Sequence, residues 1–154
     1  MKTKLFLGIC LSVIILFQSA AQPSLQWAKR FNGPVADDNG KAITLDASGN
    51  IYITGSSDGV GVASDYLTIK YNPNGDTIWT RRYNGSANGG DEAVAIKVDG
   101  AGNVYIIGKS QGTGTGYDIV TIKYNSSGIQ QWVAVFNGST NGDDLGYNLI
   151  VDVN

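Results

Sequence analysis

The 154-residue sequence has no histidine and a single cysteine, and these absences exclude several kinds of site. Without histidine there can be no Ser-His-Asp or Cys-His catalysis and no His-containing zinc site. Only 16% of the residues are charged, and 11 Lys and Arg against 13 Asp and Glu give a net charge of −2. Nucleic-acid binding calls for a clustered basic face, and no block of like charge occurs. We therefore expect no nucleic-acid partner.

Residues 1–21 are predicted to be a signal peptide. Two lysines precede an apolar run over residues 5–17, whose length suits a signal-peptide core and is short for a membrane span of about 20 residues. Small residues at positions −3 and −1 predict cleavage after Ala21. An uncleaved anchor is the alternative. Cys10 lies inside the apolar run and follows a bulky residue, which argues against a lipoprotein site.

The mature chain, residues 22–154, is then expected to be secreted or held at the cell surface. It carries nine basic and thirteen acidic residues, a net charge of −4, and no cysteine. Its fold therefore depends on packing and hydrogen bonds without disulfides, and redox chemistry and thiolate metal sites are excluded. We expect no membrane span in this mature part.

Three tryptophans mark an internal repeat. Trp27, Trp79 and Trp132 are 52 and 53 residues apart, and each leads into the same phrase, Phe or Tyr followed by Asn-Gly. Residues 38–85 laid over residues 91–138 match at 22 of 48 positions. Such self-similarity indicates a repeat architecture, with an incomplete third unit over residues 139–154.

Each complete unit is predicted to form four short strands rich in Val, Ile, Tyr and Thr. The predicted strands are 41–45, 51–55, 66–71 and 77–83 in the first unit, and 92–98, 104–109, 118–124 and 130–136 in the second. Glycine and asparagine connect them, and residues 99–103 and 125–128 read as hairpin turns. Glycine is too frequent for long helices.

Four antiparallel strands in about 50 residues is the pattern of a β-propeller blade. The predicted fold is all-β, with two complete blades and two flanking strands over residues 25–32 and 145–153. A β-sandwich is the alternative fold. Propellers use about 4–8 blades. We therefore expect this sequence to belong with the remaining blades of a longer chain, or to come from a decayed gene.

Three phrases resemble a known family. They are Leu-Asp-Ala-Ser-Gly-Asn-Ile-Tyr-Ile-Thr-Gly at residues 45–55, Val-Asp-Gly-Ala-Gly-Asn-Val-Tyr-Ile-Ile-Gly at residues 98–108, and Asp-Ile-Val-Thr-Ile-Lys-Tyr-Asn at residues 118–125. The sequence is similar to the bacterial β-propeller repeat called SBBP from about Trp27 to Asp152. That resemblance implies an exported or surface-attached propeller, and it brings no catalytic, cofactor-binding or metal-binding residue with it.

Acidic residues follow each tryptophan strand in pairs, which lie at one place in each repeat: Asp37 and Asp38, Asp91 and Glu92, and Asp143 and Asp144. Paired carboxylates can serve glycoside hydrolysis or bind calcium. Catalysis by two carboxyl groups needs two different environments that move their pKa values apart. A residue that recurs at the same place in each repeat more simply has a structural role in each repeat. We expect these side chains to cap loop amides. Calcium binding is the principal alternative, and no catalytic, metal-binding or cofactor-binding residue and no cofactor is assigned.

The repeated aromatic residues allow two interpretations. Trp27, Trp79 and Trp132, together with Tyr71 and Tyr124, are expected to pack between blades, and a carbohydrate-stacking platform is the alternative. The function predicted from the sequence is a non-catalytic binding or scaffold module with an unknown protein or glycan ligand. The alternatives are a fragment without independent function and a polysaccharide-active enzyme that uses the acidic loop residues.

Overall fold

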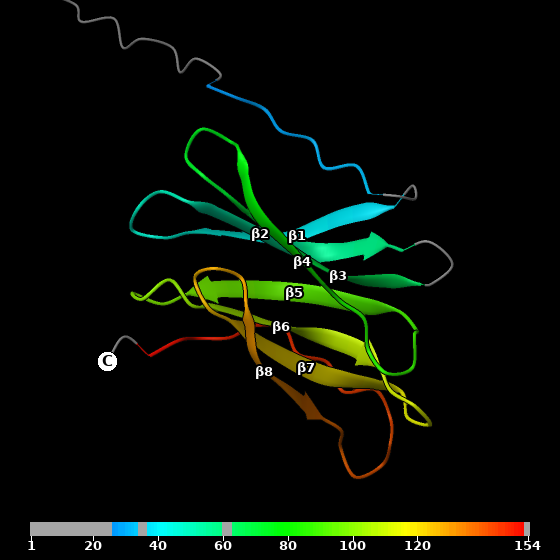
Figure 1. Ribbon diagram of the computed structural model, residues 1–154. Coiled ribbons are helices and arrows are strands. Elements are labelled where there is room, and N and C mark those ends of the chain that lie inside the picture. The colour runs from blue at the N-terminus through cyan, green and yellow to red at the C-terminus, as the bar shows by residue number, and fades with distance from the viewer. Residues whose placement is uncertain (1–25, 34–36, 60–62, 153–154) are drawn as a thin grey trace, which may run out of the picture.

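The computed structural model describes residues 26–33, 37–59 and 63–152, which contain two four-stranded antiparallel sheets (Figure 1). Blade A consists of β1 (Asp38–Leu45), β2 (Ile51–Asp58), β3 (Ser64–Tyr71) and β4 (Thr77–Tyr83). Blade B consists of β5 (Asp91–Val98), β6 (Val104–Gln111), β7 (Tyr117–Tyr124) and β8 (Gln130–Phe136). Neighbouring strands follow chain order in both sheets. The predicted all-β fold with two four-stranded blades is confirmed.

Within these described ranges, no helix is long and apolar enough to cross a membrane. The predicted signal peptide lies outside them and stays a prediction.

Two strands run beyond their predicted ends because of a β-bulge. The sequence placed the end of β2 at Gly55, but the strand continues to Asp58. The pairing of β1 with β2 shifts between Gly40 and Ala42, and there the Asn39 carbonyl oxygen would lie 1.9 Å from a Cβ on Gly55. Blade B has the same shift opposite Gly108. Glycine permits this close approach of two backbones, so it marks the bulge and not the end of the strand.

The two blades stack face to face, and the main core lies between them (Figure 1). The first strand of blade B, β5, lies at one edge of its sheet and contacts β1, β2 and β3 of blade A. The buried residues of this core are Tyr52, Tyr66, Trp79, Ala93, Ile96, Val104, Ile106, Val120, Ile122 and Tyr124. Blade B contributes buried side chains to this core from β5, β6 and β7, and the partly buried Val133 of β8 packs against them.

The two flanking segments were wrongly predicted as strands. Neither residues 26–32 nor residues 145–152 take part in a sheet. Both nevertheless contact blades: Phe31 packs against a small core on the outer face of blade A, and Gly146 is buried beside Ile107 of blade B. A strand requires a neighbouring strand with which it shares a backbone ladder, and in the described residues neither segment belongs to a sheet. Each segment therefore packs against a complete four-stranded blade without joining its sheet.

The contrast between two equivalent tryptophans supplies a first prediction. Trp79 is 6% exposed in the core between the blades, whereas Trp132 is 40% exposed on the outer face of blade B. We expect Trp79→Ala to lower the free energy of unfolding by about 3–5 kcal/mol, because it removes a large buried ring. Trp132→Ala is the matched control and is expected to cost substantially less. Urea denaturation of both variants measures the difference, and equal losses would contradict the assigned packing.

Candidate functional site

One contact that joins the blades is a tryptophan ring that packs on a turn containing glycine. The Nε1 of Trp79 donates a hydrogen bond to the Ser126 carbonyl oxygen at 3.2 Å, and its ring lies 6.2 Å from that of Tyr124. A Cβ on Gly128 would lie 2.8 Å from the indole carbon Cδ2. Gly128 also has a φ of 77°, in the left-handed region. This position therefore requires glycine both for its backbone angle and for the ring above it.

The same contact occurs one repeat earlier. The Nε1 of Trp27 donates to the Pro73 carbonyl oxygen at 2.9 Å, and its ring lies 6.4 Å from Tyr71. A Cβ on Gly75 would lie 2.8 Å from the Trp27 ring. In both copies the tryptophan covers a turn of the form Tyr-Asn-X-X-Gly. The predicted inter-blade packing of Trp79 on Tyr124 is confirmed.

The Asp-X-X-Gly-Asn segments are turns closed by a carboxylate, as predicted. Asp46 Oδ1 accepts the backbone N–H groups of Ser48 and Asn50, both at 2.9 Å. Its Oδ2 accepts the Asn50 side chain at 2.8 Å and the Tyr52 hydroxyl at 2.9 Å. Asp99 repeats the arrangement in blade B. With both carboxylate oxygens engaged within the turn, these residues serve local structure.

One acidic residue in each repeat caps a glycine amide. The N–H groups of the Asn-Gly phrases donate to a carboxylate at 2.6–2.7 Å, in the pairs Gly33 with Asp38, Gly85 with Asp91, and Gly138 with Asp144. The prediction that acidic residues cap loop amides is confirmed for these three. Such short bonds to a charged acceptor hold the loop that enters each new unit.

Of the other three acidic residues, Asp37 and Asp143 share one repeat position, and the sequence prediction that all three do is wrong for Glu92. Asp37 and Asp143 are both exposed, and Asp143 accepts the Tyr117 N–H at 2.9 Å. Glu92 forms ion pairs with Lys41 of blade A at 2.7 Å and with Lys109 of blade B at 3.3 Å. The pairs differ because the repeat spacing aligns Asp38 with Asp91, and so aligns Glu92 with Asn39.

The two capping carboxylates Asp38 and Asp91 occupy opposite electrostatic environments. The hydrogen bonds from Gly33 and Ser57 lower the pKa of Asp38, and the positive charge of Arg82 lowers it further. Asp91 is fully buried between the blades. That burial raises the pKa of Asp91 in spite of its hydrogen bonds, and the Asp65 charge raises it further.

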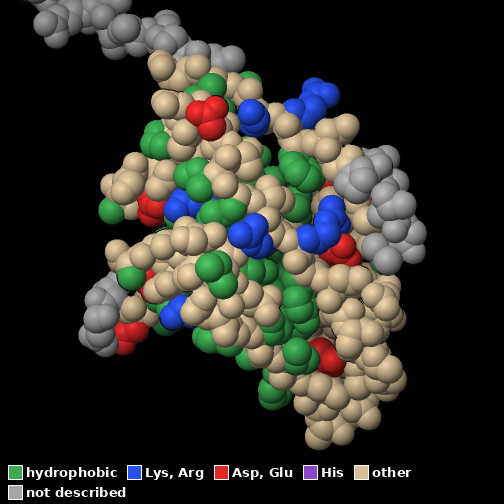
Figure 2. All heavy atoms as spheres, in the orientation of Figure 1, with side chains coloured by type: hydrophobic (Ala, Val, Ile, Leu, Met, Phe, Trp, Pro, Cys, Tyr) green, Lys and Arg blue, Asp and Glu red, His purple; other side chains and the backbone are tan. Residues whose placement is uncertain are grey.

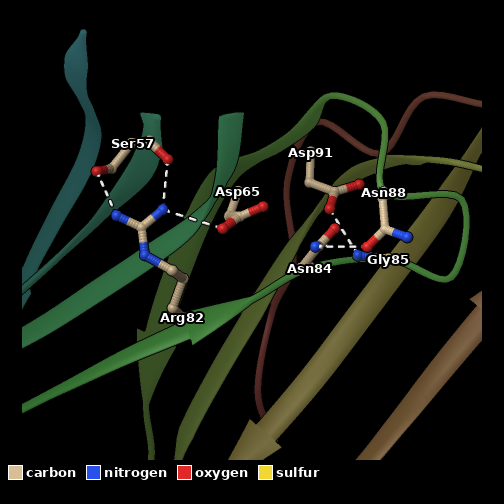
Figure 3. Close-up of polar contacts among 7 residues, drawn as sticks. All are labelled: Ser57, Asp65, Arg82, Asn84, Gly85, Asn88 and Asp91. Atoms are coloured by element: carbon tan, nitrogen blue, oxygen red, sulfur yellow. Dashed lines mark hydrogen bonds and ion pairs between the residues drawn. The ribbon is translucent and has the colours of Figure 1, made fainter. Parts of the chain in front are cut away.

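Arg82 neutralises the acidic end of blade A. Its guanidinium donates to the Ser57 carbonyl oxygen at 2.6 Å, to the Ser57 Oγ at 2.7 Å, and to Asp65 at 3.0 Å. Figure 3 shows it reaching from β4 toward Ser57 and Asp65, while Asp91 is directed toward Gly85. Asp65 is buried, and a buried carboxylate of this kind needs a partner charge.

Asp91 and Glu92 do not form a pair for glycoside hydrolysis. They are successive residues of β5, so their side chains leave opposite faces of the sheet. Asp91 has no exposed surface with which to contact a sugar. In the described part of the chain, no group of three or more His, Cys, Asp or Glu side chains is arranged to hold a metal ion.

Blade A has a polar hollow whose lining residues are not repeated in blade B. It has a volume of about 430 Å³ and is lined by Asp37, Asp38, Asn39, Ser56, Asp58 and Ser64. These residues lie where β2 ends and where β1 and β3 begin, the loop edge of blade A. The corresponding residues of blade B are Gly90, Asp91, Glu92, Lys109, Gln111 and Tyr117, so only one of the six is shared. Five of the six residues that line the hollow therefore differ between the two blades.

The sequence pattern identifies Asp37 and Asp38 of this hollow, but its other residues carry no repeat signal. Asp58, Ser56 and Ser64 are all mismatches in the overlay of the two units. Positions that break a repeat, grouped at one end of adjacent strands, are the signal that finds them. The Gly112–Gly116 segment connects β6 to β7. The matching Gly59–Gly61 segment lies partly outside the described residues.

Comparison with known families agrees with the fold. Residues 26–61 match the model of SBBP, a β-propeller repeat. The suspected family is thereby confirmed for this segment, which includes Trp27, β1 and β2. No curated protein matches the chain significantly.

Two glycines with the same backbone angle test the tryptophan contact. Gly128 and Gly114 have φ values of 77° and 78°, but a Cβ on Gly114 would meet nothing within 4 Å. We expect Gly114→Ala to cost about 1–2 kcal/mol, the penalty of a left-handed alanine. Gly128→Ala should cost about 1–3 kcal/mol more, because its methyl group meets the Trp79 ring. Thermal denaturation measures both, and equal costs would rule out the steric role.

The two capping aspartates should respond oppositely to loss of charge. An unfolded Asp titrates near pH 3.9. Because the pKa of Asp38 is lowered by folding, its charge stabilises the fold above that pH, and this contribution disappears as the pH falls below it. Because the pKa of Asp91 is raised, its charge costs stability at neutral pH, and acid relieves that cost.

Asp38→Asn should therefore destabilise the protein at pH 7, with a difference from the natural chain that shrinks toward pH 3. Asp91→Asn keeps an oxygen to accept the Gly85 N–H and should be neutral or stabilising at pH 7. Unfolding in urea at several pH values tests both. A strongly destabilised Asp91→Asn at pH 7 would contradict the assigned environment.

Proposed function

We propose that the protein is an exported or cell-surface β-propeller repeat protein that acts as a non-catalytic binding module. One observation carries the proposal: the residues that line the loop-edge hollow of blade A differ from those of blade B, while the Asp46 and Asp99 turns at the opposite edge make the same hydrogen bonds. Loops positioned by a rigid scaffold are where binding residues gather. The turns of Asp46 and Asp99 stabilise the fold in the same way in both blades. The residues at the loop edge have no such shared role and can differ between blades.

The ligand of this edge is proposed to be a protein or a glycan. Asp37 is exposed, Asp58 is half-buried, and both line the hollow with Ser56, Ser64 and Asn39. Carboxylate, amide and hydroxyl groups suit hydrogen bonds to sugar hydroxyls or to a cationic protein surface. The proposal rests on the positions of these groups and on their exposure.

Absence of catalysis and export are further parts of this proposal. The repeated carboxylates support a structural use, because Asp38, Asp91 and Asp144 all cap amides. Export is supported by the predicted signal peptide, residues 1–21, with cleavage expected after Ala21. Expression with the native N-terminus, followed by mass determination of the secreted chain, tests it. A mature protein that begins at Gln22 is expected, and retention of the whole chain in the cytoplasm would contradict export.

A binding prediction follows for the loop edge. We expect Asp37→Asn combined with Asp58→Asn to weaken retention of the ligand at least tenfold, because both charges face the hollow. Asp76→Asn is the matched control, since Asp76 is an exposed acid in a turn at the opposite edge. A glycan array and pull-downs from the cell envelope supply the ligand. Equal binding by all variants would remove the loop edge as the site, and no ligand in either screen would contradict the binding function.

A further inference from the structure

The last strand of each blade is followed by the same asparagine phrase. Residues 84–89 read Asn-Gly-Ser-Ala-Asn-Gly after β4, and residues 137–142 read Asn-Gly-Ser-Thr-Asn-Gly after β8. In an Asn-Gly pair the side-chain amide carbon and the next backbone nitrogen can approach closely, because glycine has no Cβ to obstruct them. Each phrase holds two such pairs. Since glycine follows both asparagines, their different surroundings come from the fold.

The first asparagine of each phrase is kept from reacting with its glycine. The Gly85 N–H donates to Asp91 Oδ2 at 2.6 Å, and Asn84 Nδ2 donates to Asn88 Oδ1 at 2.9 Å (Figure 3). A backbone nitrogen that loses its proton keeps the electron pair in the direction of the former N–H bond, and here that direction leads to a carboxylate. Residues 137–144 repeat both hydrogen bonds. An attack within this first pair would have to break both of them.

The second asparagine of each phrase has the opposite surroundings. Asn88 Oδ1 accepts the bond from Asn84, and Asn141 Oδ1 accepts the equivalent bond in the second phrase. Across the part of the chain that the structure describes, neither the Gly89 N–H nor the Gly142 N–H donates to an acceptor. The nitrogen that follows each second asparagine is therefore available to attack the side-chain carbon.

Both second asparagines are reached by water. Asn88 and Asn141 are exposed, and in the described residues they alone have a positive φ without being glycine, at 51° and 52°. This left-handed conformation is less favourable for asparagine than for glycine. Figure 1 places both connections at the right of the lower half of the molecule, and in Figure 2 that region is covered mainly by uncharged polar groups and backbone.

We propose that Asn88 and Asn141 are sites of spontaneous deamidation, whereas Asn84 and Asn137 are protected by the fold. At the first site, the Gly89 nitrogen forms a bond to the Asn88 carbon Cγ, and the bond between Cγ and Nδ2 breaks. Nδ2 leaves as ammonia and takes the proton that the glycine nitrogen gives up. The product is a succinimide ring that includes the backbone nitrogen.

Water then opens the ring at one of two bonds. Cleavage between the glycine nitrogen and Cγ gives aspartate. Cleavage between that nitrogen and the main-chain carbonyl carbon gives isoaspartate, in which the chain runs through the side-chain carbons. Both products carry a carboxylate where the asparagine had a neutral amide. Each conversion therefore adds negative charge to a connecting loop, and isoaspartate also lengthens the main chain there.

The Asn84 amide assists the attack on Asn88. Negative charge develops on Asn88 Oδ1 as the glycine nitrogen approaches Cγ, and the Asn84 Nδ2 already donates to that oxygen. A donor about 2.7–3.1 Å from a developing oxyanion stabilises the transition state. The hydrogen bond that occupies the first asparagine thus favours reaction of the second.

Ageing the folded protein near neutral pH tests this ranking. Labelled water marks each converted residue, and proteolysis at mildly acidic pH with mass spectrometry counts conversion at each asparagine. We expect Asn88 and Asn141 to convert at least about tenfold faster than Asn84 and Asn137, because the slower pair must first lose a hydrogen bond to a charged acceptor. In guanidinium chloride, all four should convert at similar rates. Equal rates in the folded protein, or no conversion at Asn88 and Asn141 while the unfolded chain converts, overturn the proposal.

Two matched variants test the assisting hydrogen bond. Asn84→Ala is expected to slow conversion of Asn88 by about 2- to 10-fold, the effect of one hydrogen bond, and to leave Asn141 unchanged. Asn137→Ala should slow Asn141 and leave Asn88 unchanged. Unchanged or faster conversion of Asn88 in the first variant overturns the role of Asn84. These rates are measured without a ligand, so no outcome bears on the binding function proposed for the loop edge.

Discussion

The fold depends on a flat indole ring placed on a turn that has no side chain. Trp79 can lie on the next blade only because Gly128 has no Cβ, and Gly128 can adopt its left-handed angle for the same reason. A single residue type therefore satisfies a local and a tertiary requirement at once. Since Trp27 and Gly75 repeat the arrangement, the stacking direction of the blades is set by a contact that each unit makes with the next.

Residues at the same position of two repeats can make the same hydrogen bond in different electrostatic environments. Asp38 and Asp91 make the same hydrogen bond to a glycine amide, yet folding lowers the pKa of one and raises that of the other. The cause is position in the stack: Asp38 lies on the outer side of a blade near Arg82, whereas Asp91 is enclosed between blades near Asp65. Sequence identity between repeats thus fixes the backbone role of a residue, and neighbouring units decide its electrostatics.

The sequence was sufficient for the parts of the fold that depend on one repeat alone. Alternation, turn residues and the 53-residue spacing identified all eight strands and the carboxylate-closed turns of Asp46 and Asp99. It failed where the structure depends on a neighbour. The ends of β2 and β6 follow from a bulge in the adjacent strand, and the flanking segments lack the strand that would pair with them.

Most of the candidate site was missed for a related reason. A search for repeated residues finds what the scaffold needs, and in this chain Asp38, Asp91 and Asp144 are scaffold residues because each caps an amide. Ligand binding does not require the same residue in every repeat. The residues proposed to recognise a ligand are among those that the repeat does not fix: Ser56, Asp58 and Ser64 at the loop edge of blade A. In a repeat protein, departures from the pattern are therefore a better guide to binding than the pattern itself.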